Sequence, residues 1–347
     1  MSLPSSTYLR RSIGDAARAA QPHARSVASL FLRAPVFRRA LNTLEERMGD
    51  VVLYPRRAFS VSDLADFVLH SKSLAAPFSW TCEFAGRSYL VPVDPAYPHA
   101  PPNNDPWGPA TYWHRAQNRK LRYVYEVLLA RQPQGTFLDV GANWGLHTYA
   151  FAAHGYRCVS FEPQAGCCRF IERVRALNQF THVEVVQGVV GADSGAQVPF
   201  FESEVEAFSS LDQRHVERFN FPFTPRTVEM FTIDAVCADR ALSPTVIKID
   251  AEGFEWEVVR GGLKALEASS PAILAEVSSG PDVQRAMWQA LADLKYRCYW
   301  AVRAPSKPQV HGWFIPIDSV DAFLDAGCGT DVRDDEERDF VFIRGEL

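Results

Sequence analysis

Acidic side chains stand at the ends of several short apolar runs, where α/β proteins commonly place their chemistry. Asp139 lies near the end of "TFLDV", Glu162 closes "RCVSFE", and Asp250 closes "TVIKID", with Glu252 two residues later. Because the carboxyl ends of parallel strands meet at one edge of a sheet, we expect these acids to lie close together. Carboxylates in such a place can bind hydroxyls, accept protons or hold a divalent ion.

Two glycines four residues apart follow the first of these runs, in the loop Gly141-Ala142-Asn143-Trp144-Gly145. Its spacing is neither that of a dinucleotide-binding G-x-G-x-x-G loop nor that of a P-loop. Asn143 replaces the middle glycine that would let the backbone approach a pyrophosphate. Glu162 lies about twenty residues further on, the separation at which an acid meets ribose hydroxyls. Loop and acid together predict binding of an adenosine ribose without a pyrophosphate; the alternative is a tight turn and a solvated strand end.

The stretch "TVIKIDAEGFEWEVVRGG" concentrates acids at one strand end, beside whatever the glycine loop binds. Asp250 is the acid for which this position most favours a function. For Glu252 and Glu255 the alternative is a favourable interaction with the dipole of the following helix.

The elements that would position these residues alternate between helices and short, continuously apolar strands from about residue 115. Such strands indicate a mostly parallel sheet covered on both faces, and two later runs at 295–304 and 338–347 predict an antiparallel edge. We expect strands at 136–140, 157–161, 182–190, 245–249 and 271–277, and helices at 115–132, 144–154, 164–178, 254–268 and 283–294.

The first hundred residues have a different pattern. Helices are expected to about Met48, followed by a β-hairpin whose two strands flank Ala85-Gly86. The segment "PAYPHAPPNNDPWGP" is rich in turn residues and predicts a junction near residues 95–110. The chain would then comprise an amino-terminal extension, 1–105, and an α/β domain, 106–347.

Composition limits the classes of partner and compartment. The net charge of -5 gives no general attraction to nucleic acid. Seven cysteines without a C-x-x-C pair fit a reducing compartment, and no apolar run is long enough to span a membrane, so a cytoplasmic location is expected. The start of the chain, with seven arginines and one acid through Leu44, leaves organelle targeting or membrane-surface contact as an alternative to a packed amphipathic helix.

Taken together, these motifs resemble the FkbM family of S-adenosylmethionine-dependent methyltransferases. The resemblance rests on "FLDVGANWGLHT", "FEP", "TIDAV", "IKIDAEGFEWEVVRGG" and "PAILAEVS", in order from about residue 136 to 277. It implies a class I methyltransferase (Rossmann-like) sheet of seven strands, mostly parallel, with the last strand inserted antiparallel and helices on both faces. It also implies S-adenosylmethionine as cofactor and, as acceptor, a hydroxyl of a sugar, glycolipid or polyketide-type natural product.

The resemblance also assigns roles to individual residues. The methionine part of the cofactor would lie against the strand end and loop, the ribose against Glu162, and adenine near the end of the third strand. The residues concerned are Asp139, Gly141, Ala142, Asn143 and Gly145, then Glu162, and then Gln187, Gly188 and Val189.

An alcohol acceptor needs a group that takes its proton. Asp250 is the first candidate for this base or for orienting the hydroxyl, and Glu252 is the second. Lys248 could pair with these carboxylates and keep them ionised. A magnesium or calcium ion held by Asp234, Asp250 and Glu252 is an alternative use of the same acids.

Three histidines could compete for the role of base, namely His114, His147 and His154, although each is more simply a packing or surface residue. The segment 201–231 is expected to be irregular and could cover the acceptor as a lid. A non-catalytic nucleotide-fold module and, less well supported, an NAD-dependent oxidoreductase remain as other functions. The sequence leaves a homo-oligomer open.

Overall fold

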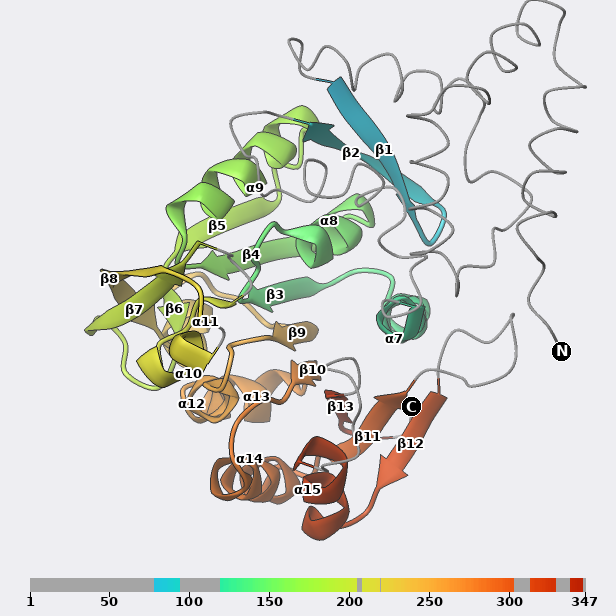
Figure 1. Ribbon diagram of the computed structural model, residues 1–347. Helices are drawn as coiled ribbons and strands as arrows, with labels where there is room; N and C mark the ends of the chain where they lie inside the picture. The colour runs from blue at the N-terminus through green and yellow to red at the C-terminus, as the bar shows by residue number, and fades with distance from the viewer. Residues whose placement is uncertain are drawn as a thin grey trace, which may run out of the picture. The chain divides into compact units, whose positions relative to one another are not determined.

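The computed structural model describes residues 78–93, 119–204, 208–218, 220–302, 313–328 and 338–345. Its centre is an eight-stranded sheet in the order β12-β11-β13-β10-β9-β3-β4-β5 (Figure 1). The strands are β3 (Thr136–Val140), β4 (Arg157–Glu162), β5 (Val183–Gln187), β9 (Val246–Ile249), β10 (Ala272–Glu276), β11 (Arg297–Val302), β12 (Trp313–Ile317) and β13 (Asp339–Ile343).

The strand directions confirm the expected fold class. The five strands from β5 to β10 run parallel, and β13 is inserted antiparallel between β10 and β11. The expectation that residues 338–347 form an edge is therefore wrong. The edge is β12, a strand that was not expected and that raises the number from seven to eight.

Helices cover both faces of this sheet, which explains why its central strands are apolar on both sides. On one face α7, α8 and α9 lie against the sheet; on the other, α11 to α15 enclose a core that includes Leu138, Ile247 and Phe340 (Figure 1). The helices are α7 (Arg119–Arg131), α8 (Leu146–Ala153), α9 (Ala165–Leu177), α10 (Gln213–Arg218), α11 (Ile233–Asp239), α12 (Glu255–Arg260), α13 (Leu263–Ser269), α14 (Pro281–Asp293) and α15 (Val320–Cys328).

The helix expected at 254–268 is divided into α12 and α13 by Gly261 and Gly262. A Cβ atom on Gly261 would lie 2.0 Å from the carbonyl oxygen of Gly191. The pair therefore ends α12 where another backbone approaches too closely for any side chain.

A second, three-stranded sheet has the order β6-β8-β7 and occupies much of the segment expected to be irregular. It comprises β6 (Val189–Val190), β7 (Gln197–Ser203) and β8 (Phe223–Phe231), and α10 lies between β7 and β8. The strand expected at 182–190 breaks at Gly188, where a Cβ atom would lie 2.6 Å from the Glu229 carbonyl oxygen. β5 thus stays in the large sheet while β6 joins the small one.

The expected hairpin is present as β1 (Phe78–Phe84) and β2 (Arg87–Val93). Ala85 and Gly86 both have positive φ, at 45° and 78°, as a two-residue hairpin turn of type I′ requires. The helices expected up to Met48, the junction at 95–110 and His114 lie outside the described residues. The boundary near residue 105 stays a prediction.

Asn178, at the end of α9, holds the hairpin to the α/β domain. Its amide oxygen accepts the Leu90 N–H at 2.6 Å, and its amide nitrogen donates to the Leu90 carbonyl at 2.7 Å. One side chain thus satisfies both backbone groups of a strand residue, as a neighbouring strand would do.

We expect Asn178→Ala to lower the free energy of unfolding by about 1–3 kcal/mol, because partly buried backbone groups of β2 lose their partners. Urea unfolding measures this loss, and faster hydrogen exchange at the Leu90 amide locates it. Gln289→Ala is the matched control, since this amide side chain is exposed and its bond to Asp293 lies within α14. Equal unfolding midpoints for the two variants would contradict the role given to Asn178.

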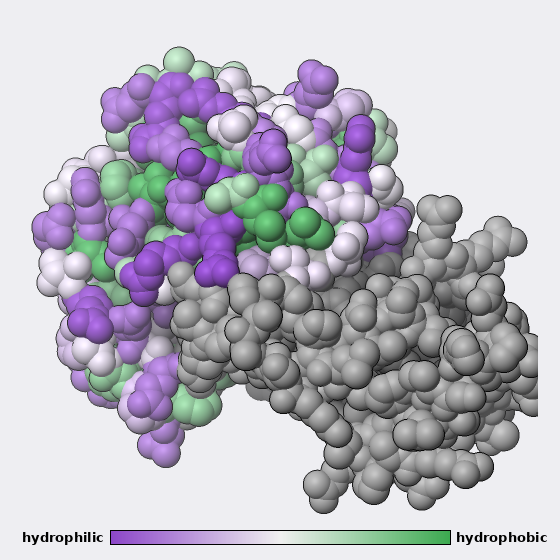
Figure 2. All heavy atoms as spheres, turned by 90° about the horizontal axis from the view of Figure 1, so that it is seen from above, coloured by the Kyte–Doolittle hydropathy of each residue, from purple (hydrophilic) through white to green (hydrophobic). Residues whose placement is uncertain are grey.

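Surface character agrees with a core enclosed between layers. On the face shown in Figure 2, hydrophilic residues are interspersed with smaller apolar patches over the part of the chain that the structure describes. Among the described helices, none combines the length and the apolar character needed to cross a bilayer.

Candidate active site

The loop that follows β3 is shaped by residues with positive φ. Gly141, Asn143 and Gly145 have φ of 75°, 48° and 77°. The N–H groups of Gly141 and Ala142 both donate to the Phe161 carbonyl on β4, at 3.1 and 3.0 Å. A Cβ atom on Gly141 would lie 1.8 Å from the Asp250 carbonyl oxygen. The loop therefore passes directly against the end of β9, and at Gly141 only glycine fits.

Glu162 is fixed by this loop at the end of β4. Its Oε2 accepts the Asn143 N–H and its Oε1 accepts the Gln164 N–H, both at 2.8 Å. The side chain is buried, and burial raises its pKa to about 7 although both hydrogen bonds favour the charged form. Each carboxylate oxygen keeps a further lone pair, so the group can accept two additional hydrogen bonds.

A cavity lies where the ends of β3, β4 and β9 meet the small sheet. Ser209, Ser210 and Leu211, from the segment 201–231 that could cover the acceptor as a lid, form part of its wall together with Phe200. The expected site residues that line this cavity are Gly141, Asn143, Glu162, Gly188, Val189, Asp250 and Glu252.

The other expected site residues lie outside the cavity lining. Asp139 is fully buried and its Oδ2 accepts the Thr148 hydroxyl of α8 at 2.6 Å. Gly145 lies under Tyr149, whose ring would be 2.7 Å from an added Cβ atom. Ala142 is buried in the loop. These residues support the residues around the cavity without lining it. Their direct contact with a cofactor stays a prediction.

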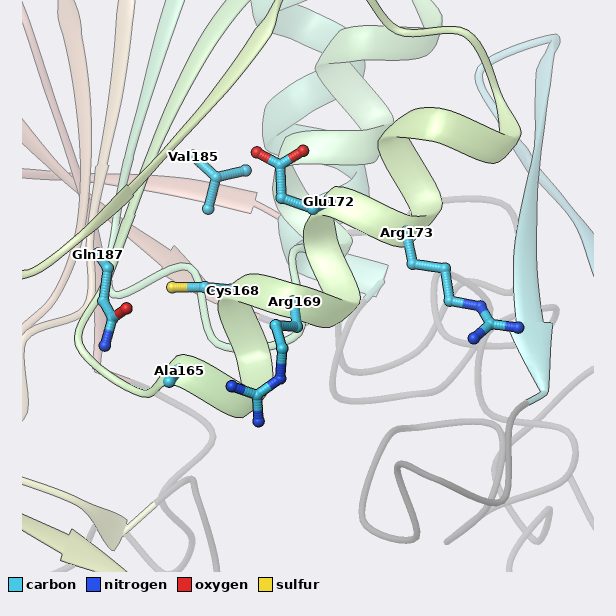
Figure 3. Close-up of a pocket in the computed structure, with 7 residues that line it drawn as sticks. All are labelled: Ala165, Cys168, Arg169, Glu172, Arg173, Val185 and Gln187. Carbon is cyan, nitrogen blue, oxygen red and sulfur yellow. The ribbon is translucent and has the colours of Figure 1, made fainter.

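Gln187 faces a different hollow, a groove between β5 and α9. Figure 3 shows Cys168 of α9 directed toward Gln187 across this groove, which Arg173 of the same helix also lines. Contact of Gln187 with adenine also stays a prediction.

Lys248 connects the acids across the sheet. It lies opposite Asp139 in the pairing of β3 with β9, and its Nζ is 2.8 Å from Oδ2 of Asp250. Burial opposes a charge on Lys248, but the carboxylates of Asp250, Asp139 and Glu276 outweigh it and raise the pKa above its usual range. A permanent cation thus holds Asp250, whose side chain remains 30% exposed.

Glu252 contacts a histidine that the sequence did not reveal. Its Oε2 lies 3.3 Å from Nε2 of His215 on α10, and its backbone carbonyl accepts the Ser210 hydroxyl at 3.2 Å. Burial raises the pKa of Glu252, and the hydrogen bond from His215 opposes this shift. No motif marks His215 or Ser210, because the segment that carries them meets Glu252 only in the folded chain.

Two further glutamates support the strand ends. Glu255 accepts the Gly253 N–H at 2.8 Å and the Ser278 hydroxyl at 3.1 Å, which fixes the turn after Asp250. Burial, with Asp250 and Asp339 adding to it, raises the pKa of Glu276 well above its usual range. Glu255 thus has a structural contact rather than only a helix-dipole interaction.

Asp234 does not join the other acids. Its carboxylate accepts the Ala265 N–H at 2.8 Å and so caps the start of α13. Among the described ranges, no three histidine, cysteine or acidic side chains come together as metal ligands. The metal alternative with Asp234, Asp250 and Glu252 as ligands is therefore not supported.

The histidines of α8 are packing residues. His147 is buried and its Nδ1 is 2.8 Å from the Tyr125 hydroxyl; burial and then Lys248 lower its pKa well below the usual range. His154 contacts the Phe84 carbonyl of the hairpin at 3.2 Å. Trp144, within the glycine loop, packs edge-on against Phe170. Neither histidine lines the cavity.

Part of the chain matches the model of a known protein family. The model of the methyltransferase FkbM domain matches residues 139–298. No curated protein sequence matches the chain.

Solved structures show likenesses at low identity. One is a methyltransferase FkbM from Methylobacillus flagellatus KT, with 15% identity over 60% of this chain and 44% of that chain, at a TM-score of 0.38. The chain thus spans less than half of that protein. A second is an S-adenosylmethionine-dependent methyltransferase from Agrobacterium tumefaciens, with 7% identity over 77% of this chain and 70% of that chain, at a TM-score of 0.38. A third is a precorrin-6y C5,15-methyltransferase from Geobacter metallireducens GS-15, with 11% identity over 64% of this chain and 87% of that chain, at a TM-score of 0.32.

Proposed function

We propose that the chain transfers a methyl group from S-adenosylmethionine to a hydroxyl, because residues 139–298 match the model of the methyltransferase FkbM domain. The proposed acceptor is a sugar, a glycolipid or a polyketide-type natural product. The observation that carries the proposal is the buried carboxylate of Glu162, held beside the glycine loop in the same cavity as Asp250 and Glu252.

The groups that line this cavity fit an adenosyl cofactor. The free lone pairs of Glu162 suit the two hydroxyls of a ribose. Asn143 offers a buried Oδ1 that has no hydrogen-bond partner within the described part of the chain, and this oxygen can accept an ammonium or amide donor. Gly141 leaves the wall next to Asp250 without a side chain. When bound there, S-adenosylmethionine would supply an electrophilic methyl group.

Asp250 is the proposed base for the acceptor hydroxyl. It faces the cavity from the end of β9, and the ion pair with Lys248 fixes one of its oxygens. The other oxygen, Oδ1, is left to accept the proton as the hydroxyl attacks. Glu252, which lines the same cavity, would orient the acceptor or share this role. Holding the hydroxyl in line near attack distance supplies much of the remaining acceleration.

Calorimetric titration of the full chain with S-adenosylhomocysteine tests the cofactor assignment. We expect one binding site per chain. A screen of glycan and natural-product extracts with methyl-labelled S-adenosylmethionine then identifies the acceptor class. Absence of binding in the titration would overturn the proposed function, whereas binding followed by labelling of a nitrogen or carbon acceptor would restrict the error to the acceptor.

A further inference from the structure

We infer that His215 is a positioning residue for Glu252, which it holds at the cavity from α10 in the ionised state that can accept a proton or a hydroxyl hydrogen bond. The inference rests on the proposed function, in which Glu252 acts on the acceptor together with Asp250. His215 belongs to none of the motifs that match the family.

Two contacts from one segment hold Glu252 at both ends. The Ser210 hydroxyl binds its backbone carbonyl at 3.2 Å, and the His215 ring lies 3.3 Å from its carboxylate. Ser210 is itself fixed to the small sheet, because its backbone exchanges two hydrogen bonds with Phe201 at 2.9 and 3.3 Å. The position of Glu252 is thus determined by the small sheet as well as by β9.

The backbone at Glu252 shows why such contacts are needed. Its φ is 46°, a left-handed conformation that glutamate rarely adopts, and Gly253 follows with φ of 99°. Strained backbone of this kind persists only where the surroundings hold it, and it occurs preferentially at functional sites. Here the turn is held on the opposite side by Glu255, which binds the Gly253 N–H.

The charges around Glu252 come from three elements. They are His215 from α10, Asp250 and Lys248 from the end of β9, and Glu276 from β10. Burial and Asp250 favour the protonated form of Glu252, whereas His215 and Lys248 favour the carboxylate. Lys248 is bound directly to Asp250. His215 therefore contacts the Glu252 carboxylate itself, and its ring nitrogen can donate a hydrogen bond that favours the carboxylate form.

Partial exposure separates this pair from a purely structural ion pair. The side chains of His215 and Glu252 are 15% and 34% exposed, whereas those of Lys120 and Asp339, which pair at 2.9 Å, are 4% and 8% exposed. Glu252 thus lines the cavity and remains partly exposed while its carboxylate contacts the imidazole.

The test measures the titration of Glu252 directly in the full chain. Glutamate labelled with carbon-13 at the carboxyl carbon is followed by NMR, and the signal missing in Glu252→Gln assigns the residue. His215→Gln keeps a hydrogen-bond donor without a charge, and His215→Ala removes both. His182→Gln is the control, because His182 contacts the Ala152 carbonyl at 2.9 Å and the ring of Phe180, and it does not line the cavity.

We expect the pKa of Glu252 to rise by about half a unit or more in His215→Gln and further in His215→Ala. His182→Gln should leave it unchanged. The Kd for S-adenosylhomocysteine should agree within about threefold among the unsubstituted chain, the two His215 variants and His182→Gln, because the ribose contact at Glu162 is unaffected. With the acceptor from the labelling screen, kcat should fall about 10- to 100-fold in His215→Ala, and the acid limb of the pH profile should move to higher pH.

An unchanged Glu252 titration in both His215 variants would overturn the inference, whether or not turnover changes. A shifted titration with an unmoved pH profile would also overturn it, since Glu252 would then not govern the reaction. A separate outcome is that the unsubstituted chain does not bind S-adenosylhomocysteine. That result would overturn the proposed function, and with it the premise on which the role of His215 depends.

Discussion

Glu162→Gln is expected to weaken S-adenosylhomocysteine binding by about 10- to 100-fold, the effect of losing hydrogen bonds to a charged group. The carboxylate can accept both ribose hydroxyls while it holds the Asn143 and Gln164 N–H groups. In Glu162→Gln, the amide NH2 group would face one of these two backbone N–H groups, so that two donors would oppose each other and one hydrogen bond would be lost. Calorimetry measures the change in Kd, and Glu184→Gln is the matched control on the neighbouring strand, since Glu184 pairs with Arg240 outside the cavity.

The raised pKa of Glu162 gives this binding a pH dependence with a defined sign. Its pKa is about 7 in the folded chain because burial disfavours the charge. The ionised form binds the ribose better, so affinity should increase as pH rises through 7, by at most about tenfold per unit. The dependence should disappear in Glu162→Gln. A Kd that is constant between pH 6 and 8 in the unsubstituted chain would contradict the ribose assignment.

Stability without cofactor should change in the opposite direction. A folded-state pKa above the unfolded value means that the contribution of Glu162 is fully present below about 4.5 and is lost as pH rises through about 7. Within this window the same carboxylate destabilises the free protein and strengthens its complex.

Asp250→Asn is expected to lower the rate of methyl transfer by about 10²- to 10⁴-fold, because asparagine cannot accept the proton of the hydroxyl. S-adenosylhomocysteine affinity should stay within about threefold, since the ribose contact is at Glu162. The fold should also persist, because Asp139 and Glu276 remain as counter-charges for the buried Lys248. Single-turnover rates with labelled cofactor and the acceptor from the screen measure the effect.

Asp293→Asn, an exposed aspartate that binds Gln289 at the end of α14, is the matched control and should react normally. Near-normal turnover in Asp250→Asn would transfer the role of base to Glu252. Loss of both binding and folding would instead show that Asp250 matters mainly as the partner of Lys248.

Much of the large sheet could be predicted because its strands are short, apolar and punctuated by glycine. Residues 136–140 form a strand with the expected bounds, since every residue after Thr136 in "TFLDV" is buried. The small sheet could not be predicted in the same way. β8 is largely exposed and β7 is only partly buried. The two strands contain Pro225 and Pro199 and are defined by their pairing with each other.

The residues of the candidate site also fall into those that could be predicted from the sequence and those that could not. The expected residues that line the cavity are those beside glycines and strand ends, where local sequence dictates the turn. His215, Ser209 and Ser210 could not be predicted, because they reach Glu252 and the cavity only through the packing of the small sheet. Asp234 resembled a ligand by its type, but its carboxylate is used by the two N–H groups at the start of α13.

The place of β13 in the sheet has a consequence for how the chain acquires its structure. β10 and β11 precede β13 in the sequence, yet each pairs with β13 and the two are not neighbours. During synthesis, both strands emerge from the ribosome before their shared partner exists. Until residues 339–343 are synthesised, the backbone groups of β10 and β11 that will pair with β13 stay unpaired. They can then aggregate or bind a chaperone. Completion of the sheet is thus a late, long-range event, and it should govern the rate of folding.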